Sequence, residues 1–252
     1  MYTITRFEFL WVFKLRFYKF TTLALLFFSS LAFALDLDGY YITPKVGISE
    51  STDTGKMDYT NGGITYSVED DDLGTATAFG LSAGKYLTDN FRLELELIKR
   101  NNYEYNARDL ADSDYNYKNS VDATALFING FYDFQSFAMG STSITPYLGV
   151  GVGISRNKTD DEKEYYQGSP DGIVTKGKTI SEFAYKFSAG TLFSVSKNLS
   201  VDLNYQYVNL GEFETSKTVY RNGVYNNTLD EGTNGGEIKS HELMVGLQYT
   251  FN

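Results

Sequence analysis

The only histidine of the chain, His241, is the side chain best suited to acid–base chemistry near neutral pH. Ser240 and Glu242 flank it, so a hydroxyl, an imidazole and a carboxylate occupy three consecutive positions. A hydrolytic site needs such groups to converge on one side of the backbone. In a strand, however, neighbouring side chains point to opposite faces, and the same-face neighbours of His241 are Lys239 and Leu243. We therefore interpret His241 as an isolated histidine and predict no catalytic site.

Two acidic runs, Glu69 to Asp72 and Asp160 to Glu162, are the other clusters that could bind a ligand. A Ca²⁺ site needs six to eight converging oxygen atoms, and neither run shows the spaced ligands of such a site. We therefore interpret both runs as solvated loop charge and predict neither a metal nor another cofactor.

The composition argues against several further classes of function. The chain has no cysteine, which excludes disulfides, thiolate metal sites and a cysteine nucleophile. Its formal net charge is −10, so the basic face that a nucleic-acid partner requires is not expected. Tyrosine and phenylalanine are abundant, with 21 and 19 residues, whereas proline occurs only 3 times. This composition favours a protein built from many β-strands.

The segment Met1 to Ala34 has the pattern of an export signal. Basic residues precede the apolar run Leu23 to Leu31, and Ala32-Phe33-Ala34 has the small-x-small form of a cleavage site. The alternative is a transmembrane anchor, but a span needs about 20 mostly apolar residues, and this run is shorter. We predict cleavage near Ala34, which leaves residues 35–252 as a single mature domain.

The last stretch of the chain, Leu243 to Phe251, shows the periodicity that organises the rest. Its odd positions are apolar or aromatic, and its even positions are mostly small or polar. Because strand side chains alternate between two faces, the segment has one apolar face and one mostly polar face. In a soluble sheet the apolar face points to the core, whereas in a membrane barrel it points to lipid and the polar face to the lumen.

The same alternation predicts eight strands along the mature chain. We place them at residues 39–50, 74–87, 91–98, 121–134, 144–155, 183–195, 199–207 and 243–251. The connections alternate between long and short, and the long ones are the polar segments 51–72, 103–119, 156–180 and 212–239. This plan is typical of an all-β protein, an eight-stranded antiparallel up-and-down transmembrane β-barrel.

Charged residues on the mostly polar face of the predicted strands distinguish a membrane barrel from a soluble one. The predicted lumen charge network comprises Lys45, Arg92, Glu94, Glu96, Lys186, Asp202 and Glu242. A soluble barrel or sandwich would bury these ions in an apolar core at a high cost, so the pattern favours a membrane barrel with a polar lumen. From strand direction we expect mixed-charge layers, in which Arg92 lies with Asp202, Lys45 with Glu94 and Glu96, and Lys186 with Glu242.

Several segments give the chain a family resemblance. They are the opening Gly39-Tyr40-Tyr41, the glycine-alternating strand Pro146 to Gly153 and the aromatic final strand, all behind an export signal. With these features the mature chain resembles the small outer-membrane barrels of the OmpA-type and opacity-protein porin superfamily. The resemblance implies location in the outer membrane and an assembly signal on Leu247, Tyr249 and Phe251. Such proteins typically end on phenylalanine, whereas this chain continues to Asn252.

Three functional hypotheses follow from this architecture. The first is a structural or adhesin-like surface protein that acts through four long external loops, because loops on a rigid scaffold commonly carry recognition. The second is a small diffusion porin, although an eight-stranded barrel is just wide enough for side chains to fill. The third is a barrel enzyme that modifies lipid A. The expected partners are outer-membrane lipid and lipopolysaccharide, the barrel assembly machinery and a host-surface ligand.

Overall fold

The computed structural model describes residues 37–52, 57–61, 64–69, 73–109, 113–140, 142–226 and 235–251. The predicted export signal, its cleavage site and most of the first acidic run lie outside these residues. The described part between Gly39 and Thr250 belongs to one compact unit. None of the helices in the described ranges is long and apolar enough to cross a membrane.

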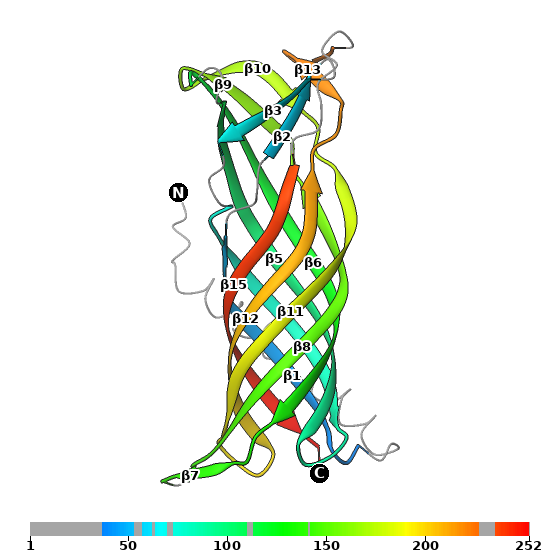
Figure 1. Ribbon diagram of the computed structural model, residues 1–252, viewed down its shortest axis with the longest axis vertical. Helices are drawn as coiled ribbons and strands as arrows, with labels where there is room; N and C mark the ends of the chain where they lie inside the picture. The colour runs from blue at the N-terminus through cyan, green and yellow to red at the C-terminus, as the bar shows by residue number, and fades with distance from the viewer. Residues whose placement is uncertain are drawn as a thin grey trace, which may run out of the picture. The chain divides into compact units, whose positions relative to one another are not determined.

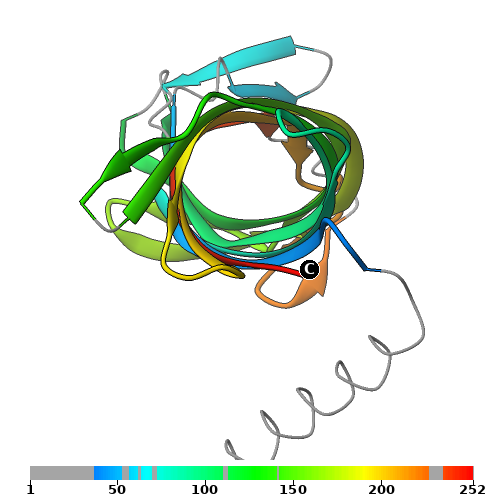
Figure 2. The same cartoon turned by 90° about the horizontal axis from the view of Figure 1, so that it is seen from below.

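The core of this unit is a ring of eight long antiparallel strands among the described residues (Figure 2). They are β1 (Tyr40–Ser51), β4 (Thr75–Tyr86), β5 (Phe91–Asp109), β6 (Tyr115–Asp133), β8 (Thr142–Thr159), β11 (Thr179–Ser194), β12 (Leu199–Glu214) and β15 (Gly235–Thr250). Each pairs with its neighbour in the chain, and β15 closes the ring on β1 through pairs such as Val46 with Val245. The predicted eight-stranded up-and-down barrel is therefore confirmed.

The outer face of the barrel is apolar, and its inner face is mostly polar. Outward side chains such as Leu95, Ile128 and Val150 are between 52% and 59% exposed. Their inward neighbours Glu94, Asn129 and Gly151 are buried. Exposing so many apolar side chains to water costs free energy, whereas lipid solvates them. The alternation therefore fits a barrel that spans a membrane.

The two ends of the barrel differ in their connections (Figure 1). At one end, here called the turn end, residues 87–90, 134–141 and 195–198 join the strands, and β7 (Phe137–Met139) pairs with the start of β8. The opposite end, here called the loop end, carries further short strands. These are β2 (Met57–Asn61), β3 (Ile64–Glu69), β9 (Glu162–Tyr166), β10 (Ser169–Thr175), β13 (Val219–Arg221) and β14 (Val224–Tyr225).

The strands extend much further toward the loop end than the sequence predicted. β5 continues to Asp109, β6 begins at Tyr115, β8 continues to Thr159 and β15 begins at Gly235. The predicted extents of the polar loops 103–119, 156–180 and 212–239 are therefore wrong, and the segment 51–72 contains the β2–β3 hairpin. Beyond the apolar belt the outward residues of these strands are mostly polar, so the alternation that marks a strand in sequence stops before the strand does.

A β-bulge in β5 changes which residues face the lumen. The register between β5 and β6 shifts between Arg100 and Tyr103, and Asn102 in this interval has a φ of 64°. The extra residue moves the inward side chains from even to odd positions. Tyr103, which is fully buried, therefore points into the barrel.

A second bulge lies in β12, where the register with β15 shifts between Asn209 and Glu212. Gly211 has a φ of 74°, a conformation that glycine adopts without strain. The side-chain amide of Asn157 on β8 holds this segment by donating to the carbonyl oxygens of Leu210 at 2.9 Å and Glu212 at 2.7 Å.

Beyond the barrel, β6, β9, β10, β13 and β14 form a continuous surface that we call the loop-end sheet (Figure 1). One row of directly opposed residues crosses all five strands: Lys118, Lys163, Val174, Tyr220 and Tyr225. On the opposite face Ile173 and Val219 are buried, at 7% and 0% exposure. The row of five therefore lies on the solvent face.

Candidate functional site

All seven residues of the predicted lumen charge network lie inside the barrel, and their side chains are nearly fully buried. At mid-height the ammonium group of Lys45 lies 3.0 Å from Glu94 Oε1 and 3.2 Å from Glu96 Oε1. The side-chain amide of Asn129 donates to both carboxylates at 3.2 Å. This layer has the composition that the sequence predicted.

The next layer toward the loop end contains two ion pairs. Lys186 forms its ion pair with Glu96, and Glu242 pairs with Arg100. Gln206 links the two pairs, since its amide nitrogen donates to Glu242 and its oxygen accepts from Lys186 at 3.2 Å. Lys186 and Glu242 therefore lie in one layer, as expected, but they contact each other through Gln206 and not directly. Arg100 was not predicted because it lies beyond the predicted end of its strand.

The turn end of the lumen is occupied by Arg92. Its guanidinium donates to both oxygens of Asp133 at 2.9 and 3.0 Å, and to Gln248 Oε1 at 3.2 Å. The rings of Phe131 and Tyr147 stack on it, with centroids 4.5 and 4.6 Å away. Both Asp133 contacts come from the Nε–H, and the charge of the guanidinium strengthens them and its contacts with the two rings.

Asp202 is the remaining member of the predicted network, and its partner is a phenol rather than Arg92. Tyr147 donates its hydroxyl to Asp202 Oδ1 at 2.6 Å, and Asn204 donates to the same hydroxyl oxygen at 2.7 Å. Arg92 and Asp202 share Tyr147 as a neighbour, so they lie near each other without forming an ion pair. The tilt of the strands brings Asp133 next to Arg92 instead.

An apolar cluster fills the lumen toward the loop end, which the sequence analysis missed. Its largest side chains are Tyr103, Phe127, Phe213, Leu210 and Ile238, all with at most 2% exposure. Two of them follow the bulges in β5 and β12, where the simple alternation of faces fails. Side chains therefore occupy part of the space that the ribbons of Figure 2 leave empty.

The inward glycines of β8 make room for large neighbours. A methyl group on Gly149 would overlap the Phe131 ring, and one on Gly151 would overlap Asn129 Oδ1. A methyl group on Gly153 would overlap the Leu126 carbonyl oxygen. These glycines therefore serve close packing of the lumen and do not leave open space.

His241 lies on the outer face of β15, opposite in direction to its buried neighbours Ser240 and Glu242. Its imidazole Nδ1 lies 2.6 Å from the Tyr205 hydroxyl oxygen, and the two rings stack with an angle of 14°. The Tyr207 ring packs against the other side at 5.3 Å. His241 therefore belongs to an aromatic cluster on the barrel exterior, which the sequence analysis did not identify.

The loop-end sheet combines basic and aromatic side chains on its solvent face. The Lys118 ammonium lies 5.1 Å from the Tyr165 ring centroid, and that of Lys176 lies 5.3 Å from the Tyr220 ring. Tyr220 packs edge-on against Tyr225, which is 60% exposed. This arrangement provides broad rings and positive charge, a combination suited to recognition of another surface.

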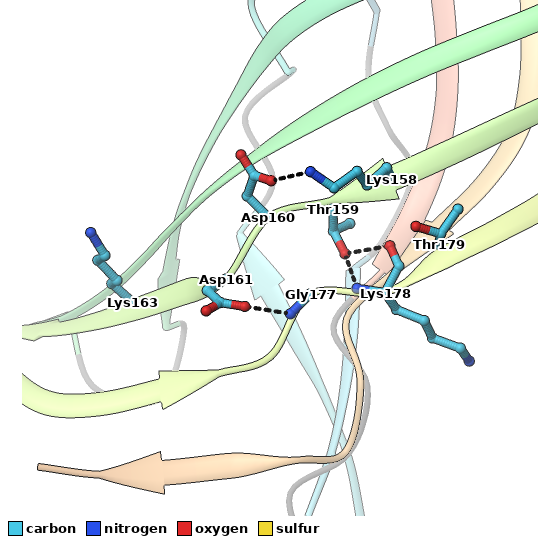
Figure 3. A pocket seen from close by; sticks show the side chains of 8 residues that line it. All are labelled: Lys158, Thr159, Asp160, Asp161, Lys163, Gly177, Lys178 and Thr179. Atoms are coloured by element: carbon cyan, nitrogen blue, oxygen red, sulfur yellow. Dashed lines mark hydrogen bonds and ion pairs between the residues drawn. The ribbon is translucent and has the colours of Figure 1, made fainter. Parts of the chain in front are cut away.

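A groove of about 580 Å³ lies beside this face, between the β8–β9 connection and the β10–β11 connection (Figure 3). Asp161 bridges its two sides, because its carboxylate accepts from Lys176 Nζ at 2.6 Å and from the backbone N–H of Gly177 at 3.0 Å. These hydrogen bonds lower the pKa of Asp161. Asp160 pairs with Lys158. Across the described residues no group of three acidic or histidine side chains could hold a metal ion.

Comparisons with known proteins agree with this architecture. The family described as "Outer membrane protein beta-barrel domain" matches residues 20–251. Outer membrane protein PagN of Salmonella typhimurium is 31% identical over 54% of this chain, which covers 53% of PagN. A candidate adhesin of Rickettsia conorii is 28% identical over 67% of the chain and is covered to 65% of its own length. The chain thus spans between about half and two thirds of these relatives.

Among solved structures, the outer membrane protein OprG from Pseudomonas aeruginosa has the same fold. The match has a TM-score of 0.59 at 13% identity and covers 85% of this chain and 97% of OprG. At this level of identity the likeness concerns the fold alone.

Proposed function

Because this chain belongs to the outer membrane protein β-barrel domain family, we propose that it is an adhesin-like surface protein that binds through the loop-end sheet. The barrel then serves as a packed membrane scaffold without a catalytic role. Curated relatives named as an outer membrane protein and as candidate adhesins support this proposal. The ligand is expected on a host surface.

The observation that carries the proposal is the solvent face of the loop-end sheet. Lys118, Lys163, Tyr165, Tyr220 and Tyr225 lie there on strands that continue the rigid barrel wall. Side chains on ordered strands lose little conformational freedom on binding, and tyrosine supplies a large contact area at low entropic cost. A diffusion porin receives less support, because ion pairs and an apolar cluster fill the lumen.

Adhesion of intact cells tests the proposal. Cells that produce the protein should bind host cells better than cells without it, and Tyr165→Ser with Tyr220→Ser should remove most of the gain. The matched control is Tyr166→Ser, because Tyr166 follows Tyr165 in β9 but points to the opposite face. Equal adhesion of the double variant and the wild type, at equal surface amounts, would contradict the proposed face.

The proposal places the loop end outside the cell and the turn end in the periplasm, after removal of residues 1–34. The chain contains no cysteine, so single cysteines introduced at Gln167 and Lys197 can be labelled selectively. An impermeant reagent on whole cells should label Gln167→Cys at the loop end and leave Lys197→Cys unlabelled. The reverse pattern would show the opposite orientation and would remove the basis for loop-end adhesion.

A further inference from the structure

On the four adjacent strands β5, β6, β8 and β11, the apolar outer surface of the barrel has a sharp edge toward the loop end. Leu97, Leu126, Ile154 and Phe183 are directly opposed across these four strands, and each is at least 49% exposed. We call these residues the last apolar row. They form the edge of the apolar belt toward the loop end, because the next outward residue on each strand is polar.

These next residues form a second row, two positions closer to the loop end: Lys99, Thr124, Arg156 and Ser181. We call this the cation row. Neighbouring strands are about 4.8 Å apart, so the backbones of Lys99 and Arg156 are separated by roughly 10 Å, with Thr124 between them. Both side chains are long enough to converge above Thr124, and hydroxyl donors flank Arg156 on both sides.

The carboxylates around the cation row pair with lysines, so Arg156 is available to bind a ligand. Lys99 lies 3.3 Å from Asp122 in an ion pair whose side chains are 50% and 36% exposed. Lys158, which is opposed to Asp122, pairs with Asp160 at 2.9 Å. Within the described ranges no carboxylate forms an ion pair with Arg156, and its side chain is exposed. A surface ion pair such as Lys99–Asp122 is weak enough to rearrange around a ligand.

We propose that the cation row binds a phosphate group of the phosphorylated glycolipid in the outer leaflet, with Arg156 and Lys99 as the charged contacts. The site is continuous with the apolar belt, so a lipid whose acyl chains lie along Leu126 and Ile154 presents its headgroup at this height. Arginine binds phosphate oxygens through paired hydrogen bonds, and the flanking hydroxyls add neutral donors. Burial against lipid strengthens these contacts relative to water.

This assignment rests on the proposed orientation, since only an outward loop end brings the cation row to the outer leaflet. Binding can be measured in nonionic detergent, however, where orientation has no effect. A failure of the whole-cell labelling would therefore be distinguishable from a failure of the phosphate site itself.

The test is the thermal unfolding midpoint of the purified protein, followed by circular dichroism, with and without bisphosphorylated lipid A. The wild-type midpoint should rise with this lipid. It should not rise with the dephosphorylated lipid or with inorganic phosphate alone. Lys99→Gln combined with Arg156→Gln should lose most of the shift, whereas Lys197→Gln, which removes an exposed cation at the turn end, should retain it.

Three results would overturn the inference: no shift for the wild type, an equal shift with dephosphorylated lipid or inorganic phosphate, or an unchanged shift in the double variant. Midpoints without lipid show whether each variant folds. If the double variant does not fold, Arg156→Lys and Arg156→Gln provide the comparison. The lysine variant should retain more of the shift, and equal shifts in these two variants count against the site.

Discussion

Arg100 on β5 and Glu242 on β15 form a fully buried, two-point ion pair inside the barrel. The distances are 2.5 Å from Nε to Oε1 and 2.9 Å from Nη2 to Oε2, and neither side chain is exposed. Two strands, β1 and β4, separate β5 from β15 in the ring, so the pair spans the lumen. The pair lies where the lumen charge network meets the apolar cluster of the loop end.

Loss of one partner of this pair should destabilise the barrel. Arg100→Met leaves Glu242 buried without its cation, which we expect to cost about 3–5 kcal/mol of unfolding free energy. Arg100→Met combined with Glu242→Leu removes both charges and should recover most of that loss. Denaturant unfolding in lipid vesicles measures both values, and a single variant as stable as the wild type would contradict the role of the pair.

Two glycines that face opposite sides of the barrel wall test whether the lumen is packed. Gly153→Ala places a methyl group against the Leu126 carbonyl oxygen and the Phe127 ring, so we expect a loss of about 1–3 kcal/mol. Gly130→Ala meets no atom within 4 Å and should be neutral or slightly stabilising. Gly130 lies on the outward face of β6 with Leu126 and Ile128, so this variant is the control for the glycine-to-alanine change itself, whereas Gly153 faces the lumen. Equal stabilities would indicate that the lumen near Gly153 is open.

Ion conductance in planar bilayers should distinguish a scaffold from a pore. The wild-type protein should show little steady conductance, because the Lys45 layer, the Arg92 site and the apolar cluster close the lumen in series. Glu94→Ala leaves Lys45 with one fewer partner and should produce intermittent leaks and lower thermal stability. Lys85→Ala, which removes a cation that lies over the Tyr40 ring, is the control. Large stable channels from the wild type would favour the diffusion porin.

The sequence predicts which side chains of each barrel strand point to lipid and which point to the lumen. It does so because apolar and polar residues alternate with a period of two along the whole apolar belt. On β6, for example, Asn129 and Asp133 are buried inside and Leu126 and Ile128 are exposed outside, as the alternation requires. Fold class and lumen charge therefore followed from local patterning.

The pairing of the lumen residues could not be predicted in the same way. Which charges meet depends on the stagger between strands, a property of the closed ring, and this stagger brings Arg92 to Asp133 rather than to Asp202. Tyr103 was missed because the bulge in β5 reverses the face on which it lies. Arg100 kept the predicted alternation but lay beyond the predicted end of the strand.

The hydrogen bonds that Asp161 accepts across the loop-end groove should weaken at low pH. Hydrogen bonds from Lys176 and from Gly177 hold the pKa of Asp161 below its ordinary value. The stabilisation by its carboxylate is therefore fully present above the unfolded pKa of about 3.9 and is lost as pH falls through the lowered folded value. Hydrogen exchange of the Gly177 amide, corrected for intrinsic rates, should show protection at pH 6 that disappears in strong acid.

The matched variants for this bridge are Asp161→Asn and Asp171→Asn. Asp161→Asn should weaken Gly177 protection already at pH 6 and flatten its dependence on acid. Asp171 accepts a hydrogen bond from the Ile173 amide at 2.9 Å within β10, so its substitution should leave the Gly177 profile unchanged. A wild-type profile in Asp161→Asn would mean that the backbone alone closes the groove.

The final strand should carry the signal for membrane assembly. Leu247 and Tyr249 face outward on β15 and are 45% and 43% exposed, as an externally read signal requires. Phe251 follows the strand directly and adds an aromatic ring to this row, so we expect the assembly machinery to read it. Phe251→Ala should lower the amount of heat-modifiable barrel in outer-membrane fractions more than Asn252→Ala does. Equal, normal assembly of both variants would contradict a recognition role for Phe251.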